Sequence, residues 1–175
     1  MTIRLMIIDD HDLVRDGLAQ YFGMQPDIEV VAEATCCKDL LGKLKTVQAD
    51  ILLLDMCMPG VDGKHMISLI KTFFPDLRIL ILSAHDEVHT VLGAMRAGAS
   101  GYICKTCSPQ ALLEAVKEVM ATGKYLTREM AERLEYAAAS TRPTNDGVED
   151  QNDAIRLNGG YDPRVEGRLQ NLPPR

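Results

Sequence analysis

The sequence has no long hydrophobic run and no export signal. No apolar stretch among its 175 residues approaches the ~20 residues that a membrane-spanning helix needs. The first residues, MTIRLMIIDD, lack the basic, then apolar, then small-residue order of a secretory signal peptide. We therefore expect a cytoplasmic protein that does not bind a membrane.

An excess of positive charge is also missing. The 19 Lys and Arg residues are outnumbered by 25 Asp and Glu residues, which gives a formal net charge of −6. Proteins that bind nucleic acid usually carry a concentrated basic face. The charge balance therefore predicts no direct DNA binding by this chain.

The sequence lacks an even set of cysteines. Five cysteines are a poor basis for a disulfide framework. Cys104 and Cys107 have CxxC spacing, but no second pair is present to complete a metal site. We interpret Cys104 as a small buried residue of a strand and Cys107 as part of the loop after it.

Strand-like and helix-like patterns alternate along the first 123 residues. The predicted strands are 3–9, 28–34, 51–55, 78–84 and 100–105, and the predicted helices are 12–23, 38–47, 63–74, 87–98 and 109–123. In helix 12–23, Val14, Leu18, Tyr21 and Phe22 share one face. The strands are apolar along nearly their whole length, as a parallel sheet covered on both faces requires. The sequence therefore predicts an α/β fold with a doubly wound, five-stranded parallel sheet.

Three regions follow from this pattern. Residues 1–123 form the predicted α/β domain, and 124–140 form a linker whose helix, 127–139, begins after Thr127 as N-cap. Residues 141–175 contain many Asn, Asp, Gly and Pro residues and no lysine. This composition predicts a low-order, disordered tail.

Polar residues stand where the predicted strands end. The first strand ends in Asp9-Asp10, Asp55 ends the third, Ser83 lies at the end of the fourth, and Lys105 ends the fifth. The carboxyl ends of parallel strands lie along one edge, so these side chains should converge. Three carboxylates repel one another unless a cation lies among them, and oxygen ligands suit Mg²⁺.

Such a site can perform phosphoryl transfer with Asp55 as the nucleophile. Lys105 would pair with one phosphate oxygen, and the hydroxyl of Ser83 would donate a hydrogen bond to another. The alternative for Ser83 is that it merely caps helix 87–98. The four histidines, His11, His65, His85 and His89, are interpreted as surface or loop residues.

Four motifs together resemble the receiver domain of two-component response regulators. They are IIDDHD, LLLDMCMPGVDG, ILSAHD and GYICK, in the family's order and spacing. The resemblance implies the flavodoxin-like receiver fold, with Asp55 as phosphoacceptor. It also implies that Asp9, Asp10, Asp55 and the backbone carbonyl of Cys57 hold Mg²⁺.

The same resemblance assigns a conformational switch. Ser83 and Lys105 would contact the phosphoryl group, and Tyr102 would turn inward when Ser83 moves toward it; the alternative is a static core tyrosine. The implied protein is not a metabolic enzyme and catalyses only its own phosphorylation and dephosphorylation. It would receive its phosphoryl group from a sensor histidine kinase. It could then homodimerise, either through helix 87–98, strand 100–105 and helix 109–123 or through helices 12–23 and 109–123.

The segments DDHD, RAGASGYICK and GKYLT resemble the NarL/FixJ (LuxR-type) subgroup, whose members usually carry a C-terminal helix-turn-helix and control transcription. Residues 140–175 contain no amphipathic helix pair and no basic recognition helix. Two interpretations stay open: a regulator of transcription that lacks this domain, and a stand-alone receiver that acts only through protein contacts. An aspartyl-phosphate hydrolase is a remote alternative, because it needs an acid two residues after the nucleophile, where Cys57 stands.

Overall fold

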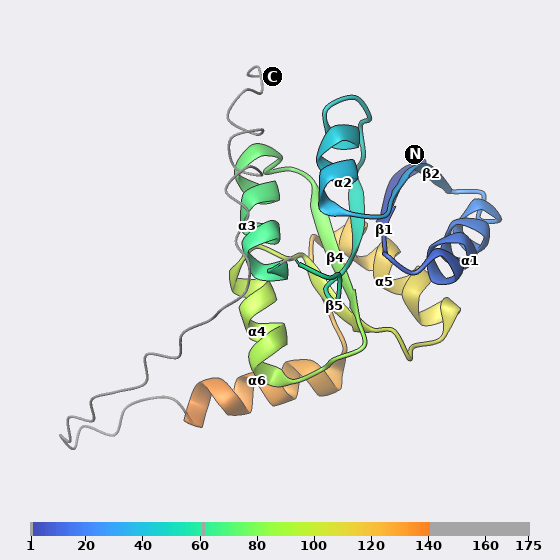
Figure 1. Cartoon of the computed structure of the whole chain (residues 1–175). Coiled ribbons are helices and arrows are strands. Elements are labelled where there is room, and N and C mark those ends of the chain that lie inside the picture. Colours follow the sequence, from blue (N-terminus) through green and yellow to red (C-terminus); the bar gives the residue numbers. More distant parts are fainter. Residues whose placement is uncertain (1, 61, 141–175) are drawn as a thin grey trace.

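A single parallel sheet, with helices on both of its faces, organises the computed structural model, which describes residues 2–60 and 62–140 (Figure 1). The strand order is β2-β1-β3-β4-β5-β6, and every neighbouring pair is parallel. The strands are β1 (Ile3–Ile8), β2 (Ile28–Ala34), β3 (Ile51–Asp55), β4 (Arg78–Ser83), β5 (Gly101–Cys104) and β6 (Tyr125–Leu126). The helices are α1 (Asp12–Gly23), α2 (Cys37–Leu44), α3 (Gly63–Phe73), α4 (Val88–Arg96), α5 (Pro109–Thr122) and α6 (Arg128–Ser140). The predicted α/β fold with a parallel sheet is confirmed; the predicted tail, 141–175, lies outside the described residues.

The sheet has one strand more than the five that the sequence predicts. Tyr125 and Leu126 of β6 pair with Gly101 and Tyr102 of β5. Two residues are too few to show the alternation that identifies a strand in a sequence. Gly101 permits this close approach, because a Cβ there would lie 2.8 Å from the carbonyl oxygen of Tyr125.

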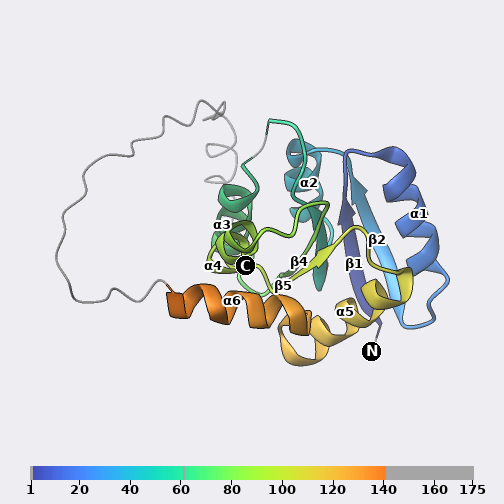
Figure 2. The same cartoon turned by 90° about the horizontal axis from the view of Figure 1, so that it is seen from below.

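Alternate residues of the central strands face opposite layers of helices, and Figure 2 shows these layers on the two sides of the sheet. One face packs against α2, α3 and α4, and it includes Met6, Ile8, Leu52, Leu54, Ile79, Ile81 and Tyr102. The other packs against α1 and α5, and it includes Leu5, Ile7, Ile51, Leu53, Leu80, Leu82 and Ile103. Burying one such Leu or Ile side chain contributes roughly 1.5–3 kcal/mol, so both layers stabilise the sheet.

The apolar face of helix α1 is covered unevenly along its length. Phe22 is fully buried and packs in the core, whereas Val14, predicted on the same face, is 37% exposed. The neighbouring Leu13 is 88% exposed. The first turns of α1 therefore present apolar side chains to solvent, while its last turn anchors the helix to the sheet.

No helix within residues 2–60 and 62–140 is long and apolar enough to cross a membrane.

An ion pair fastens the amino-terminal ends of β1 and β3. The carboxylate of Asp50 accepts hydrogen bonds from the backbone N–H of Arg4 at 2.8 Å and from its Nη2 at 2.6 Å. The backbone N–H of Asp50 in turn donates to the carbonyl of Arg4 at 2.9 Å. The hydrogen bond from the Arg4 side chain lowers the pKa of the Asp50 carboxyl. The charged form of Asp50 is therefore the form that stabilises this end of the sheet.

We expect Asp50→Asn to lower the free energy of unfolding by about 1 kcal/mol at neutral pH, because a neutral amide replaces a charged acceptor. The pKa of Asp50 is depressed in the folded state, so its contribution is present above the ordinary carboxyl pKa and is lost as the pH falls through the folded-state value. The difference between variant and wild type should therefore shrink below about pH 4. Urea unfolding at several pH values measures this difference.

A matched control is Glu114→Gln, which changes an exposed contact with Gln110. Its effect should stay below about 0.5 kcal/mol at every pH. Equal losses for the two variants, or a loss for Asp50→Asn that grows at low pH, would contradict the role of this ion pair.

Candidate functional site

The ends of the central strands bring the predicted polar residues together. In the register of the sheet, Ile8 of β1 lies beside Leu54 of β3, and Ser83 of β4 lies beside Cys104 of β5. The residues at or just beyond these ends therefore share one edge. Asp9, Asp55 and Ser83 are buried there, each with at most 2% of its surface exposed.

Lys105 joins two of the carboxylates at this edge. Its Nζ lies 2.7 Å from Oδ2 of Asp9 and 2.8 Å from Oδ2 of Asp55. Burial by itself lowers the pKa of Lys105, but the hydrogen bonds to Asp55 and Asp9 outweigh this effect and leave the pKa above its ordinary value. Lys105 is therefore a cation at neutral pH and offsets part of the acidic charge around it.

A cluster of ligand atoms stands beside this ion pair. Asp9, Asp10, His11 and Asp55 each offer one atom, and these atoms lie within 4.8 Å of one another. Oδ1 of Asp10 is buried, and no contact to it from the described residues has the geometry of a hydrogen bond, although Nδ1 of His11 lies 3.0 Å away. A buried carboxylate oxygen whose hydrogen-bonding capacity is unfilled fits a divalent cation, and oxygen-rich ligand sets suit Mg²⁺.

His11 is a neighbour of the acids that the sequence did not single out. Its backbone N–H donates to Oδ1 of Asp9 at 2.8 Å, and its Nδ1 lies 3.1 Å from the same oxygen. The same ring nitrogen lies 3.0 Å from Oδ1 of Asp10. The side chain is 61% exposed, so the predicted surface location is correct although the ring contacts both acids. Its position in the sequence, directly after two acids at a strand end, was the signal that could have predicted these contacts.

The sequence also did not identify Arg15 as a residue that supports the acidic turn. Its side chain is only 12% exposed, and it lies 2.8 Å from Asp12 and 3.4 Å from Glu33. Its Nη1 donates to the carbonyl of Asp9 at 3.3 Å. Arg15 thus ties the start of α1 and the end of β2 to the acidic turn. The i,i+3 spacing of Asp12 and Arg15 on a helix was the signal for the first of these contacts.

The loop after β3 orients Asp55 from the other side. The backbone N–H of Cys57 donates to Oδ1 of Asp55 at 2.9 Å. The side chain of Cys57 is exposed at the mouth of the site, and its Sγ lies 3.7 Å from Oγ of Ser83. Each carboxylate oxygen of Asp55 therefore has its own donor. The predicted role of the Cys57 carbonyl as a metal ligand stays a prediction.

Ser83 and Tyr102 are both hydrogen-bonded to the backbone of His85. Oγ of Ser83 accepts a hydrogen bond from the backbone N–H of His85 at 3.2 Å. The hydroxyl of Tyr102 donates to the carbonyl of His85 at 2.7 Å. Tyr102 points inward and is 3% exposed, and burial raises its pKa. Glu87, not Ser83, is the N-cap residue of α4, which leaves the Ser83 hydroxyl facing the site.

The cysteines are all free thiols. Cys104 is half-buried, which corrects its interpretation as a buried strand residue: it is the last residue of β5, where cover by the neighbouring helices ends. Cys107 is also half-buried, and burial raises its pKa. Burial raises the pKa of Cys37 to about 11, so this thiol stays protonated at neutral pH.

We expect Lys105→Met to lower the free energy of unfolding by about 2–4 kcal/mol in buffer without divalent cations, because two buried carboxylates lose their shared cation. Chemical denaturation measures the loss. Lys124→Met, which removes the charge of an exposed lysine, is the control and should change stability by less than about 0.5 kcal/mol. A Lys105 variant as stable as this control would show that the carboxylates do not depend on the ammonium.

Comparisons with known proteins agree with this geometry. The family model described as "Response regulator receiver domain" matches residues 5–117. The chain is 35% identical over 132 residues to the transcriptional regulatory protein DegU of Brevibacillus brevis, a match that covers 75% of this chain and 56% of DegU. It thus spans little more than half the length of that relative.

Solved structures give the same result. A two-component response regulator of the LuxR family from Aurantimonas sp. SI85-9A1 superposes with a TM-score of 0.73 at 30% identity, covering 79% of this chain and 99% of that one. The isolated REC domain of RcsB from Salmonella enterica serovar Typhimurium, solved with phosphomimetic BeF3-, has a TM-score of 0.68 at 27% identity and covers 77% and 99%. Fold, site geometry and family match together show that this chain belongs to the response regulator receiver domain family.

Proposed function

We propose that this protein is a phosphorylation-dependent switch in which Asp55 accepts a phosphoryl group from a sensor histidine kinase. The observation that carries the proposal is the setting of Asp55. Its carboxylate is buried at a strand end, held by the Cys57 N–H and by Lys105, and adjoins the acidic cluster of Asp9 and Asp10. These contacts fix the nucleophile in one orientation before a donor arrives.

The transfer balances without a further reactant. A carboxylate oxygen of Asp55 forms a bond to phosphorus, the bond between phosphorus and the imidazole nitrogen of the kinase breaks, and that imidazole takes up a proton. Asp9, Asp10, Asp55 and the Cys57 carbonyl would hold Mg²⁺. When bound, Mg²⁺ would neutralise charge shared by the carboxylate and the phosphoryl oxygens.

In this proposal Lys105 and Ser83 each contact one oxygen of the phosphoryl group. Lys105 exchanges its contact with Asp55 for a phosphoryl oxygen and keeps its contact with Asp9. The hydroxyl of Ser83 donates to a second phosphoryl oxygen, so it moves relative to His85. Tyr102, bonded to the other end of the same residue, then changes its surroundings and carries the change to the surface of α4 and β5.

The output is proposed to be transcription, reached through partner contacts or dimerisation in the cytoplasm and without direct DNA binding by this chain. DegU, a relative, is named a transcriptional regulatory protein. A stand-alone receiver that acts only through protein contacts is the alternative. The hydrolase alternative gains no support, since Cys57 offers no carboxylate as an acid catalyst near Asp55.

We expect wild-type protein incubated with acetyl phosphate and Mg²⁺ to give a retarded band on a phosphate-affinity gel. Asp55→Asn should give none, because the nucleophile is gone, and omission of Mg²⁺ should abolish the band. Asp62→Asn, which alters an exposed helix cap on the following loop, is the matched control and should be phosphorylated like wild type. A band that persists in Asp55→Asn would refute the assignment of Asp55 as the phosphoacceptor.

We also propose that homodimerisation uses α1 and α5. Leu13 and Val14 of α1 are exposed apolar residues, and α1 and α5 cover the same face of the sheet (Figure 2). The other predicted dimer face, α4–β5–α5, is partly occupied, because β6 pairs along β5 and α6 packs on α4. A patch of apolar side chains that is exposed to solvent favours self-association, because association removes it from water.

Leu13→Glu should prevent this association, because the charged side chain cannot be buried in an apolar interface. Sedimentation of protein activated with beryllofluoride should give a dimer for wild type and a monomer for Leu13→Glu. Met24→Glu, at the opposite end of α1 and likewise exposed, is the control and should dimerise normally. Dimerisation of Leu13→Glu with wild-type affinity would exclude this face.

A further inference from the structure

The side chain of His11 contacts the acids of the site instead of capping the helix that it precedes. His11 is the N-cap residue of α1, yet its side chain makes no capping hydrogen bond. Its Nδ1 lies 3.1 Å from Oδ1 of Asp9 and 3.0 Å from Oδ1 of Asp10. The usual N-cap residues are serine, threonine, asparagine and aspartate, whose oxygens accept from the helix. The imidazole at this position therefore has its contacts with the two acids and not with the helix.

Two hydrogen bonds hold the backbone from which the acids and the ring project. The N–H of His11 donates to Oδ1 of Asp9 at 2.8 Å, which closes the turn between these residues. Nη1 of Arg15, whose side chain is 12% exposed, donates to the carbonyl of Asp9 at 3.3 Å. A ligand of the turn would therefore find its contacts already arranged, which lowers the entropic cost of binding.

The spacing of these atoms suits neighbouring ligands of one metal ion. An octahedral divalent ion holds its ligands at about 2.0–2.1 Å, which separates adjacent ligand atoms by about 3.0 Å. The two contacts of Nδ1 of His11, to Asp9 and to Asp10, are 3.1 and 3.0 Å long. Asp55 offers a further atom, and the four atoms lie within 4.8 Å of one another. An ion bound there would have a nitrogen ligand beside its oxygen ligands.

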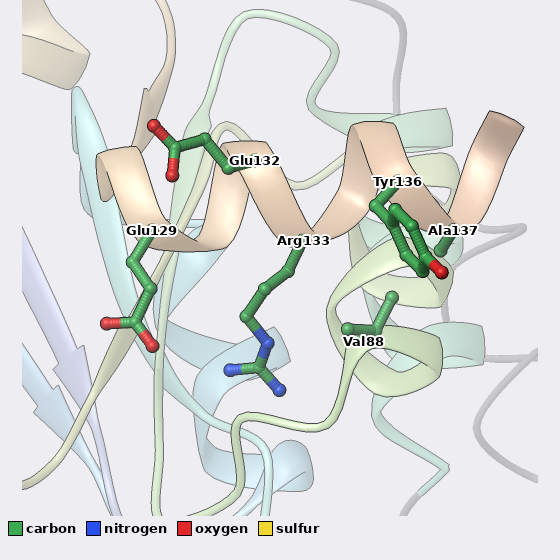
Figure 3. Close-up of a pocket in the computed structure, with 6 residues that line it drawn as sticks. All are labelled: Val88, Glu129, Glu132, Arg133, Tyr136 and Ala137. Atoms are coloured by element: carbon green, nitrogen blue, oxygen red, sulfur yellow. The ribbon is translucent and has the colours of Figure 1, made fainter.

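Two acids elsewhere on the surface pair with arginine, which has no lone pair to offer a metal. Nη1 of Arg133 on α6 donates to Oδ2 of Asp86 at 3.2 Å, in the loop before α4. Figure 3 shows Arg133 reaching from α6 toward that loop. Glu132 of the same helix pairs with Arg128. At Asp10 the neighbouring base is instead an imidazole, whose neutral form has a lone pair that can bind a metal.

We propose that His11 is a metal ligand and raises the preference of the site for divalent transition metals over Mg²⁺ above that of a set of carboxylates. The inference rests on the proposed binding of a divalent cation by Asp9, Asp10 and Asp55. Carboxylate and carbonyl ligands suit Mg²⁺, whereas imidazole suits ions later in the first transition row, such as Co²⁺ and Ni²⁺. Nδ1 gives its lone pair to the metal, and the ring carries its proton on Nε2. The side chain is 61% exposed, so a hydrated ion can reach it from solvent.

The first test is isothermal titration of the full-length, untagged protein with Co²⁺ and, separately, with Mg²⁺ near neutral pH. His11→Ala should lower the affinity for Co²⁺ about ten-fold or more, because a nitrogen ligand is lost, and should change the affinity for Mg²⁺ less than about two-fold. His89→Ala, which removes an exposed histidine of α4 outside the cluster, is the control and should bind both ions like wild type. Asp55→Asn should weaken the binding of both ions.

The second test records the proton NMR spectrum of the Co²⁺ complex. An imidazole bonded to this paramagnetic ion gives strongly shifted ring resonances, which should be present in wild type and His89→Ala and missing from His11→Ala. A purely structural role of His11 would give no such resonances in wild type.

The inference is overturned if His11→Ala binds both ions like the His89→Ala control, or loses affinity for both ions equally. It is also overturned if His11→Ala gains affinity for both, which would show that the ring competes with the metal for the carboxylates. Failure of wild type to bind either ion, together with a lack of phosphorylation in Mg²⁺, would instead refute the proposed function. The two failures are therefore distinguishable.

Discussion

The contact of Lys105 with two buried carboxylates is the interaction on which the site depends. Its Nζ lies within 2.8 Å of both Asp9 and Asp55, which come from neighbouring strands. Without a cation these acids would repel each other at the end of an apolar sheet. The ammonium makes the acidic pocket compatible with a folded core, and it stands where a phosphoryl group on Asp55 would need a positive partner.

The parallel sheet explains why so few residues suffice to build this site. Each strand delivers one polar residue to the same edge, and the helices on both faces bury the apolar remainder. Backbone donors complete the arrangement, as the Cys57 N–H does for Asp55. Helix-covered strands are rigid, so the geometry of the site is set by packing far from it.

His85 and its neighbours connect the phosphoacceptor edge of the sheet to the loop before α4 and, through that loop, to α6. One residue receives the hydroxyl of Tyr102, supplies a donor to Ser83, and precedes the acid that pairs with α6. The strands on either side of it are fixed by the apolar core, whereas these contacts are single hydrogen bonds of a loop. A switch is energetically accessible where exchange of a few contacts leaves the apolar layers intact.

The order of strands and helices, the parallel sheet and the convergence of Asp9, Asp55, Ser83 and Lys105 were determined by the sequence alone, because apolar periodicity and strand ends are local features. The contacts between segments far apart in the chain were not determined by the sequence alone. The pairing of Tyr125–Leu126 with β5, the ring of His11 against two acids and the ion pair of Arg133 with Asp86 came only from the tertiary structure. The exposure of Val14 also came only from the structure: periodicity places it on one helix face with Phe22, but only packing decides how much of that face is covered.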